Sequence, residues 1–382
     1  MYIPRVRLEK RIVRALKNNP GVIILGPRQC GKTTIARKIC KDIGAFEFFD
    51  LENPLDAVRL ENPLLTLENL NGLVVIDEIQ RRPELFEVLR VLMDRPNTNT
   101  TYLILGSASP DLVKKASETL AGRVGFVDMS GFSLDELESR DFQKLWYRGG
   151  FPRSFLAPDD EVSYSWRMDF IRTFLERDIP QLGISIPSQT LRRFWTMLAH
   201  YSGQRWNATE FARSLDTSQK TAKRYLDILT DTFVVRQLQP WYENIKKRQV
   251  KAPKIYIRDS GILHALLGIS NAKSLYYHPK LGASWEGFVI EQIASLCQYE
   301  QLYFWQTHGG AELDLLLVKN GRKIGVEIKY TEKPRITKTI SISINDLDLE
   351  KLYIVYPGDK SFTLSKKVEV LSILNLNQIF ES

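Results

Sequence analysis

The stretch Val22-Ile-Ile-Leu-Gly-Pro-Arg-Gln-Cys-Gly-Lys-Thr-Thr34 joins a short apolar run to a glycine-rich turn. It contains Gly26-x-x-x-x-Gly31-Lys32-Thr33, a pattern in which a buried strand leads through a phosphate-binding loop into a helix. The two glycines let the backbone curl so that successive N–H groups point at phosphate oxygens. The predicted nucleotide-binding residues are Gly26, Pro27, Arg28, Gln29, Cys30, Gly31, Lys32, Thr33 and Thr34.

The residues that follow the loop strengthen this prediction. Residues 34–41 are compatible with a helix, whose N-terminus would add the positive end of its dipole. Lys32 could then reach the β- and γ-phosphates of a nucleotide, and the Thr33 hydroxyl could ligate Mg²⁺. The alternative is a chance glycine-rich turn between a strand and a helix. The flanking elements favour a site for ATP or GTP with Mg²⁺.

A second motif, Gly72-Leu-Val-Val-Ile-Asp77-Glu78, is an apolar strand closed by two carboxylates. Such a strand is typical of a buried parallel sheet whose carboxyl edge faces a ligand. Asp77 would hold Mg²⁺ together with Thr33, and Glu78 would orient or deprotonate the attacking water. Apolar strands often end in acidic residues, but the position about 45 residues after Lys32 suits this role. The two motifs together predict nucleotide hydrolysis.

Two further residues have two interpretations each. Ser107 ends the predicted strand 101–107, where it could sense the γ-phosphate or, with Ser109, cap the next helix. Arg123 follows Gly122 just before the predicted strand 125–129. It could serve as an arginine finger or be a surface charge.

The bulk properties narrow the class of protein. A chain of 382 residues suggests two or three domains. No apolar run reaches the roughly 18 residues of a membrane span, and the N-terminus has no apolar core of a secretory signal. Three cysteines without metal-ligand spacing fit a reduced, cytoplasmic protein. The formal charge of +8 favours an anionic partner such as nucleic acid.

The pattern of elements predicts the fold. Strands at 22–26, 45–50, 72–77, 101–107 and 125–129 alternate with helices, which indicates a doubly wound α/β domain over 1–140 with a parallel sheet. Residues 141–200 form a mostly helical segment that is interrupted at Arg148-Gly-Gly-Phe-Pro152.

Residues 201–270 show the pattern of a winged helix-turn-helix. Two short helices, 207–215 and 219–230, flank a turn and precede the apolar β run 233–238. The second helix carries basic residues that would face phosphates in a groove, and a basic run follows it. This fold can also pack protein against protein, with its basic residues simply solvated; we favour nucleic acid. The DNA-contact candidates are Lys220, Lys223, Arg224, Lys246, Lys247 and Arg248.

Residues 271–382 contain a second group of polar residues. Asp314 lies on a strand that ends in the hairpin turn Asn320-Gly321, and Glu327 and Lys329 lie on the return strand. Alternate strand residues share a face, so these side chains meet, with Glu286 supplied by a helix. Carboxylates can hold a divalent metal, and a lysine beside them can activate water. The arrangement resembles the PD-(D/E)xK nuclease core, either as a cutting site or as an inherited pocket that binds without cutting.

Taken together, these motifs resemble the bacterial and archaeal AAA-superfamily ATPases that carry a C-terminal domain of unknown function. The resemblance implies ATP as the nucleotide, a helical lid over 141–200, a restriction-endonuclease-like C-terminal fold, and a homo-oligomer in which Arg123 acts in trans. One departure is Ser107, where many AAA proteins have a sensor Asn. The motifs that carry it are Gly26-Pro-Arg-Gln-x-Gly-Lys-Thr, Asp77-Glu-Ile-Gln80, Leu105-Gly-Ser, Leu120-Ala-Gly-Arg123, Arg148-Gly-Gly-Phe-Pro152, Glu176-Arg-Asp-Ile179, Tyr225-Leu-Asp-Ile-Leu229 and Lys254-Ile-Tyr-x-x-Asp-Ser-Gly261.

Three functional hypotheses follow. The first is an ATP-hydrolysing AAA protein that binds or remodels DNA, including branched DNA. The second is a nucleotide-gated, metal-dependent nuclease. The third is a nucleotide switch that binds a protein partner.

Overall fold

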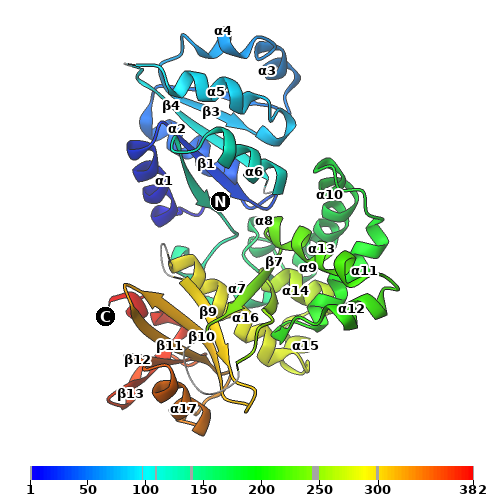
Figure 1. The fold of residues 1–382 in the computed structure, drawn as a ribbon, viewed down its shortest axis with the longest axis vertical. Helices are drawn as coiled ribbons and strands as arrows, with labels where there is room; N and C mark the ends of the chain where they lie inside the picture. Colours follow the sequence, from blue (N-terminus) through cyan, green and yellow to red (C-terminus); the bar gives the residue numbers. More distant parts are fainter. Residues whose placement is uncertain are drawn as a thin grey trace. The chain divides into compact units, whose positions relative to one another are not determined.

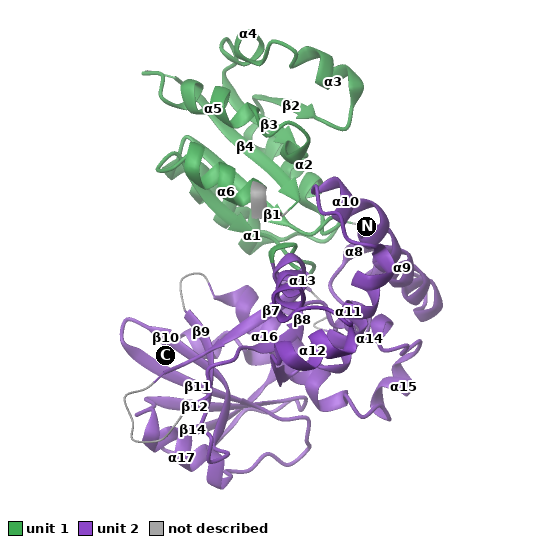
Figure 2. Ribbon diagram, turned by 45° about the vertical axis from the view of Figure 1, so that its right-hand side comes forward, with its two compact units in different colours: residues 1–132, 231–233 green, residues 133–230, 234–382 purple. Residues whose placement is uncertain are grey.

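The computed structural model describes residues 2–96, 98–107, 110–137, 141–242, 249–297 and 301–381. The chain forms two compact units (Figure 2). Unit 1 comprises residues 1–132 and 231–233, and unit 2 comprises residues 133–230 and 234–382.

Unit 1 is built on a five-stranded parallel sheet with the order β2-β3-β4-β1-β5. Its three inner strands, β3, β4 and β1, are labelled in Figure 1. Its central strand β1 is buried along its whole length, as expected for a strand covered on both faces. The predicted parallel α/β sheet is therefore confirmed, with shifts of one residue at several strand ends. The strands are β1 (Gly21–Gly26), β2 (Phe46–Asp50), β3 (Gly72–Asp77), β4 (Thr100–Ser107) and β5 (Val124–Asp128).

Helices cover both faces of this sheet. On one face, α1 and α2 contact each other and the central strands, and α1 buries the helically spaced Leu8, Ile12 and Leu16. On the other face, α5 and α6 contact each other and share a hydrophobic core with the strands. The helices of unit 1 are α1 (Val6–Asn18), α2 (Lys32–Ile43), α3 (Pro54–Arg59), α4 (Pro63–Leu67), α5 (Leu85–Met93) and α6 (Pro110–Thr119), with a 3₁₀ turn at Ile79–Arg81.

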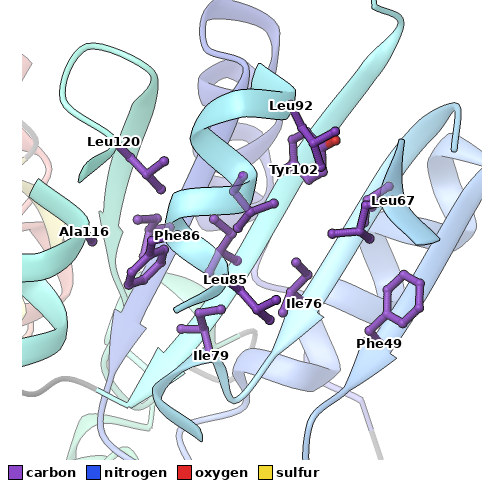
Figure 3. Packing of buried hydrophobic residues seen from close by; sticks show 14 of the residues in the cluster. Phe49, Leu67, Ile76, Ile79, Leu85, Phe86, Leu92, Tyr102, Ala116 and Leu120 are labelled. Atoms are coloured by element: carbon purple, nitrogen blue, oxygen red, sulfur yellow. The ribbon is translucent and has the colours of Figure 1, made fainter. Parts of the chain in front are cut away.

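The core beneath α5 holds the strands in register. Phe86 and Leu85 of α5 pack among apolar side chains from several strands, including Ile76 of β3 (Figure 3). Alternate residues of each strand supply this face, because successive strand side chains point to opposite sides. The core therefore fixes the carboxyl ends of β1, β3 and β4 at one edge of the sheet.

Unit 2 begins with the predicted helical segment. Its first break is at Gly149, which follows α7 with a left-handed φ of +77°. A π-helical turn at Phe174–Asp178 joins α9 to α10, so the helical path continues through Pro180. The helices are α7 (Phe142–Arg148), α8 (Pro152–Phe155), α9 (Asp160–Thr173), α10 (Ile179–Gln181) and α11 (Ser188–His200).

The motifs Arg148-Gly-Gly-Phe-Pro152 and Lys254-Ile-Tyr-x-x-Asp-Ser-Gly261 allow α7 and α14 (Ser260–Leu266) to pack closely. A Cβ on Gly149 would lie 2.1 Å from Asp259 Oδ1, and one on Gly261 would lie 2.1 Å from the Arg148 carbonyl oxygen. Asp259 also accepts hydrogen bonds from the Gly150 and Ile262 N–H groups. Glycine is required here because a Cβ would meet the Asp259 side chain at position 149 and the Arg148 backbone at position 261.

A mixed nine-stranded sheet completes unit 2, with the order β13-β14-β12-β11-β10-β9-β7-β8-β6. Its two parts join where β7 pairs in parallel with β9, at Gln239 and Tyr303. Residues 201–270 and 271–382 thus share one sheet, and the four-domain division stays a prediction. The strands are β6 (Gln204–Arg205), β7 (Val235–Pro240), β8 (Lys254–Ile257), β9 (Gln301–Gln306), β10 (Glu312–Lys319), β11 (Arg322–Ile328), β12 (Lys351–Tyr356), β13 (Phe362–Ser365) and β14 (Val368–Ser372).

The remaining helices of unit 2 include the three that the sequence predicts, α12, α13 and α16. Two short helices precede β7, and a long helix with both faces largely buried precedes β9. They are α12 (Ala208–Ser214), α13 (Gln219–Asp231), α15 (Ala272–Tyr276), α16 (Leu281–Leu296), α17 (Lys338–Asp346) and α18 (Gln378–Glu381).

Candidate functional site

The loop between β1 and α2 has the backbone that its glycines predict. Gly31 adopts φ +102° immediately before α2, and Gln29 also has a left-handed φ of +64°. A Cβ on Gly26 would lie 2.1 Å from the Met129 carbonyl oxygen. The buried Cys30 packs against the same carbonyl, with its Sγ 3.8 Å away. A larger residue at position 26 would push the loop away from β5.

Lys32 lies inside the curve of this loop. Its side chain is buried, and its Nζ donates hydrogen bonds to the carbonyl oxygens of Gly26, at 2.9 Å, and Pro27, at 2.8 Å. The ammonium group is therefore held against the backbone of the loop, at the N-terminus of α2. A buried cation at a helix N-terminus suits the binding of an anion.

Thr33 and Asp77 meet across the sheet edge. The Thr33 hydroxyl donates to Asp77 Oδ2 at 2.7 Å, although the two residues are 44 positions apart. Burial raises the pKa of Asp77 to about 6, with the Glu78 carboxylate adding to the effect and the Thr33 hydrogen bond opposing it. A hydroxyl beside a buried carboxylate is the oxygen donor pair that suits Mg²⁺.

Glu78 has an unusual backbone and a fixed side chain. Its φ of +58° is left-handed, a strained conformation for a glutamate. Its N–H donates to Asp77 Oδ1 at 2.9 Å, and its Oε2 accepts a hydrogen bond from Gln80. Arg28 of the loop lies 3.8 Å from the same oxygen. The carboxylate is thereby held at the same edge as Asp77.

Gln80 connects Glu78 with the end of β4. Its Nε2 donates to Glu78, while its Oε1 accepts from the Ser107 N–H at 3.1 Å. Sequence reasoning assigned no role to Gln80, although it stands in the Asp77-Glu-Ile-Gln80 motif. Only its position two residues after the carboxylate could have drawn attention to it.

Ser107 is the last residue of β4 and pairs with Gly26 at the end of β1, as predicted for a residue near the loop. Its Oγ is buried and has no hydrogen-bond partner among the residues that the structure describes. The helix-cap interpretation involves Ser109, which lies outside the described residues.

Arg123 lies at the opposite edge of the sheet. It precedes β5, and the register places Val124 beside Gly21 at the start of β1. Its guanidinium makes two hydrogen bonds of 2.7 Å with the Asp94 carboxylate. The structure therefore does not bring Arg123 to the loop of its own chain.

In unit 2, β10 and β11 bring Asp314, Glu327 and Lys329 together. Leu315 pairs with Val326, so Asp314 and Glu327 follow at the next position of each strand. Lys329 Nζ lies 2.7 Å from Glu327 Oε1 and 3.9 Å from Asp314 Oδ2, which also accepts from the Ile328 N–H. A register shift between β9 and β10 brackets Asp314, and such irregularities often re-aim a side chain.

Glu286 reaches the same pocket from α16, but it has cationic and phenolic partners. Lys254 of β8 lies 3.0 Å from Glu286 Oε1 and also pairs with Glu312. The Tyr256 hydroxyl donates to Glu286 at 2.5 Å. Sequence reasoning missed Lys254, Tyr256 and Glu312 as members of this group. Alternation along β8 would place residues 254 and 256 on one face, but nothing in the sequence pairs that face with α16.

Burial dominates the electrostatics of this carboxylate pocket. Burial, with the nearby Glu327 and Glu286 carboxylates, holds the pKa of Asp314 well above its usual range. Burial also raises the pKa of Glu327, against the effect of Lys329. For Lys254, burial lowers the pKa, but Glu286 and its neighbours outweigh it and leave that pKa well above normal. Within the described parts of the chain, no group of three or more His, Cys, Asp or Glu is placed to hold a metal ion.

The basic residues predicted to contact DNA lie partly within the described chain. Lys220, Lys223 and Arg224 are exposed on α13, and their spacing places them on one helix face. Lys223 pairs with Asp227 at 2.7 Å and donates to Gln237. Lys246, Lys247 and Arg248 lie outside the described residues.

Comparison with known proteins places these features in a family. Residues 18–138 match a model described as an AAA domain. Residues 139–273 and 281–376 match two domains of unknown function, DUF8612 and DUF4143. The "Uncharacterized protein Rv2008c" of Mycobacterium tuberculosis is 54% identical over 368 residues, covering 96% of this chain and 83% of that protein. The chain belongs to the same family as this mycobacterial protein.

A second relative, "Uncharacterized protein Mb2031c" of Mycobacterium bovis, has the same identity and coverage. Among solved structures, the Walker-type ATPase PABY2304 of Pyrococcus abyssi is 16% identical, with a TM-score of 0.48 over 70% of this chain and 96% of that one. A RuvB point variant of Thermotoga maritima is 17% identical, with a TM-score of 0.32 over 62% of this chain and 90% of that one.

The match to an AAA domain covers this loop and supports a nucleotide-binding P-loop domain in unit 1, while the individual residues of the nucleotide site stay predictions. No helix in the described part of the chain is long and apolar enough to cross a membrane.

Proposed function

We propose that this chain is a Mg²⁺-dependent ATPase of the AAA type. The observation that carries the proposal is the 2.7 Å hydrogen bond between Thr33 and Asp77, directly beside the buried Lys32. Two motifs far apart in sequence thus form one oxygen-rich, lysine-bearing edge. That is the constellation that phosphoryl transfer requires.

Each residue has a defined role in this proposal. The loop N–H groups and Lys32 bind the phosphates and hold them in line for attack. Thr33 and Asp77 would hold Mg²⁺, which neutralises phosphate charge when it is bound. With a pKa of about 6, Asp77 is ionised at neutral pH and can serve as a ligand. Glu78 orients the water and accepts its proton.

Two substitutions test the ATPase proposal. Lys32→Ala is expected to abolish ATP binding and turnover, because it removes the positive charge from the loop. Glu78→Gln is expected to bind ATP normally but hydrolyse it at least about 100-fold more slowly. Lys38→Ala is the control, since Lys38 lies on the same helix and pairs only with the exposed Asp42 among its described contacts. Full turnover in Lys32→Ala would overturn the proposal.

We further propose that unit 2 binds DNA through the α12–α13 helix pair. A turn separates the two helices, and an antiparallel strand pair, β7 and β8, follows them. This order of elements supports the proposal of a winged helix-turn-helix. Its second helix presents Lys220 and Arg224 to solvent, and the chain carries a net charge of +8. Exposed cations on a second helix suit phosphate contacts.

A binding panel tests this proposal. Single-stranded, duplex and branched DNA are titrated with and without ATP, using the wild type and the double variant Lys220→Ala with Arg224→Ala. The double variant should bind several-fold more weakly and show a shallower salt dependence. Lys114→Ala with Lys115→Ala on α6 removes the same charge elsewhere and should bind normally. If no DNA form binds or changes turnover, the DNA proposal fails, and a nucleotide switch for a protein partner becomes the better hypothesis.

The carboxylate pocket supports a second candidate function, a nucleotide-gated nuclease of the PD-(D/E)xK type. Lys329 Nζ lies 3.9 Å from Asp314 and 2.7 Å from Glu327, on the two strands where that pattern expects these residues. The candidate requires Mg²⁺- or Mn²⁺-dependent DNA cleavage that disappears in both Asp314→Ala and Lys329→Ala. Cleavage that survives either substitution would exclude it.

Arg123 supports a homo-oligomer within the same proposal. It lies at the sheet edge opposite its own P-loop, so it could act only on the nucleotide of a neighbouring copy. In that case Arg123→Ala lowers turnover while ATP binding is unchanged, and mixing it with Lys32→Ala restores part of the activity. A monomer with full turnover would exclude the role in trans.

A further inference from the structure

One face of β8 is directed at the acidic residues of α16. Lys254 and Tyr256 contact Glu286, and Arg258, two positions on, lies 3.2 Å from Glu291. Alternate strand residues share a face, so one short segment supplies all three partners. The position of Lys254 is therefore set by the pairing of a whole strand with a helix.

Lys254 joins two carboxylates in the pocket. Its ammonium lies between Glu286 and Glu312, its side chain is buried, and its Nζ is 5.5 Å from the centre of the Phe304 ring. Glu312 is fixed from its other side, because its Oε2 accepts from Gln306 at 2.9 Å. Both carboxylates thus already have a buried cationic partner.

The other half of the pocket has an exposed cation, Lys329, where the first half has the buried Lys254. Lys329 pairs with Glu327 Oε1, but Glu327 Oε2 is buried without a hydrogen-bond partner among the described residues. One carboxylate oxygen of Asp314 accepts a hydrogen bond from the Ile328 N–H. A buried, unpartnered carboxylate oxygen needs a donor or a cation to offset its desolvation. The oxygen available to an added cation therefore lies on the Asp314–Glu327 side.

We propose that Lys254 is a resident cation of the pocket that keeps Glu286 and Glu312 from coordinating a divalent metal ion. A divalent ion beside the ammonium would be repelled strongly, because both charges are buried. The pocket can then offer only Asp314 and Glu327, which is few ligands for Mg²⁺ or Mn²⁺. These residues are therefore not arranged to bind a metal ion tightly with Glu286 as one of its ligands. This inference concerns metal binding and does not depend on ATP turnover, DNA binding or cleavage.

The test is a Mn²⁺ titration of the full chain without nucleotide, in which free Mn²⁺ is measured by electron paramagnetic resonance. Lys254→Met keeps an unbranched apolar side chain next to Phe304 and removes the charge. It is expected to bind Mn²⁺ at least about tenfold more tightly than the wild type, because two carboxylates are released and a positive charge is lost. Adding Glu286→Gln to Lys254→Met should return the affinity towards that of the wild type.

Lys351→Met is the matched control. Lys351 lies in the same sheet and pairs with Glu369 at 2.8 Å, so the substitution also removes a lysine–glutamate pair, and Mn²⁺ affinity should not change. A folded Lys254→Met chain with unchanged or weaker Mn²⁺ affinity would overturn the proposal, with circular dichroism and ATP turnover reporting the fold.

A single substitution in the presence of Lys254 gives an independent check if Lys254→Met does not fold. Glu286→Gln is nearly isosteric and should change Mn²⁺ affinity by less than about threefold, because Glu286 is not a ligand in the proposed state. A loss of tenfold or more would identify Glu286 as a ligand and refute the proposal. These titrations contain no nucleotide and all the substitutions lie in unit 2, so failure of this proposal can be distinguished from failure of the ATPase proposal.

Discussion

At the scale of single residues, the nucleotide site depends on side chains that hold one another in place. Thr33 contacts Asp77, Asp77 accepts from the Glu78 N–H, and Gln80 connects the Glu78 carboxylate to Ser107. The strained φ of Glu78 persists because these contacts surround it. Gln80 is thus a positioning residue for the proposed general base.

We predict that Gln80→Ala lowers the kcat of ATP hydrolysis by roughly 10- to 100-fold with little change in KM. The substitution removes the donor that fixes Glu78, and misplaced bases lose much of their effect. Steady-state kinetics and a fluorescent-nucleotide binding assay measure both quantities.

Arg81→Ala is the control for this prediction. Arg81 is the residue after Gln80, and its substitution removes only an exposed ion pair with Glu52. An equal loss of ATP affinity and of kcat in Gln80→Ala would point to a damaged fold and contradict the positioning role.

At the scale of elements, a buried histidine joins three helices of unit 2. His264 of α14 lies 2.9 Å from the Tyr147 carbonyl oxygen of α7 and 2.7 Å from Ser284 Oγ of α16. Ser284 Oγ also accepts from the Trp146 indole N–H. Burial lowers the pKa of His264 to about 3, so the imidazole is neutral in the folded protein.

This histidine makes stability depend on pH. The folded pKa of about 3 lies below the unfolded value near 6.5, so the unfolded state binds more protons between these values. The contribution is fully present above pH 6.5 and is lost as the pH falls towards 3. We predict that the wild type loses up to about 1.4 kcal/mol of unfolding free energy per pH unit below pH 6.5 relative to His264→Gln.

Urea denaturation of both proteins at pH 7.5, 6.5, 5.5 and 4.5 measures the difference. His308→Gln is the control, because His308 is exposed in the same unit and its loss should leave the wild-type slope intact. Parallel curves for the wild type and His264→Gln would contradict the prediction.

At the scale of the whole molecule, unit 2 is joined across its predicted domain boundary. The β7–β9 pairing continues one sheet through residues 239 and 303. Glu291 of α16 accepts from Arg236 of β7 and from Arg258, which follows β8. The Glu291 side chain is 12% exposed, so losing both arginines would leave a largely desolvated carboxylate unpaired and costs up to roughly 3–5 kcal/mol.

We predict that residues 281–382 do not fold alone, whereas residues 133–382 do. The shorter fragment exposes the edge of β9 and leaves Glu291 and Glu286 without their partners from the preceding segment. Circular dichroism and thermal unfolding of both fragments measure this. A cooperative transition in the shorter fragment would instead support a separate C-terminal domain.

The sequence by itself determined the parallel α/β domain and the P-loop. Both depend on short-range patterns: apolar runs of strand length, and glycines at set positions that permit the loop backbone. It also predicted the paired strands of Asp314 and Glu327, because a hairpin turn fixes their register locally.

Only the tertiary structure decided the partners of these residues. Gln80 meets Ser107 from 27 positions away, Arg123 is directed to Asp94, and Lys254 enters the carboxylate pocket from 32 positions before Glu286. Such pairs arise because strands and helices that are distant in the chain lie side by side in the fold, and that arrangement is set by packing of the whole core. The spacing of residues in a sequence motif can therefore predict which residues form a loop. It cannot predict which charged side chains from other parts of the chain lie next to them in the fold.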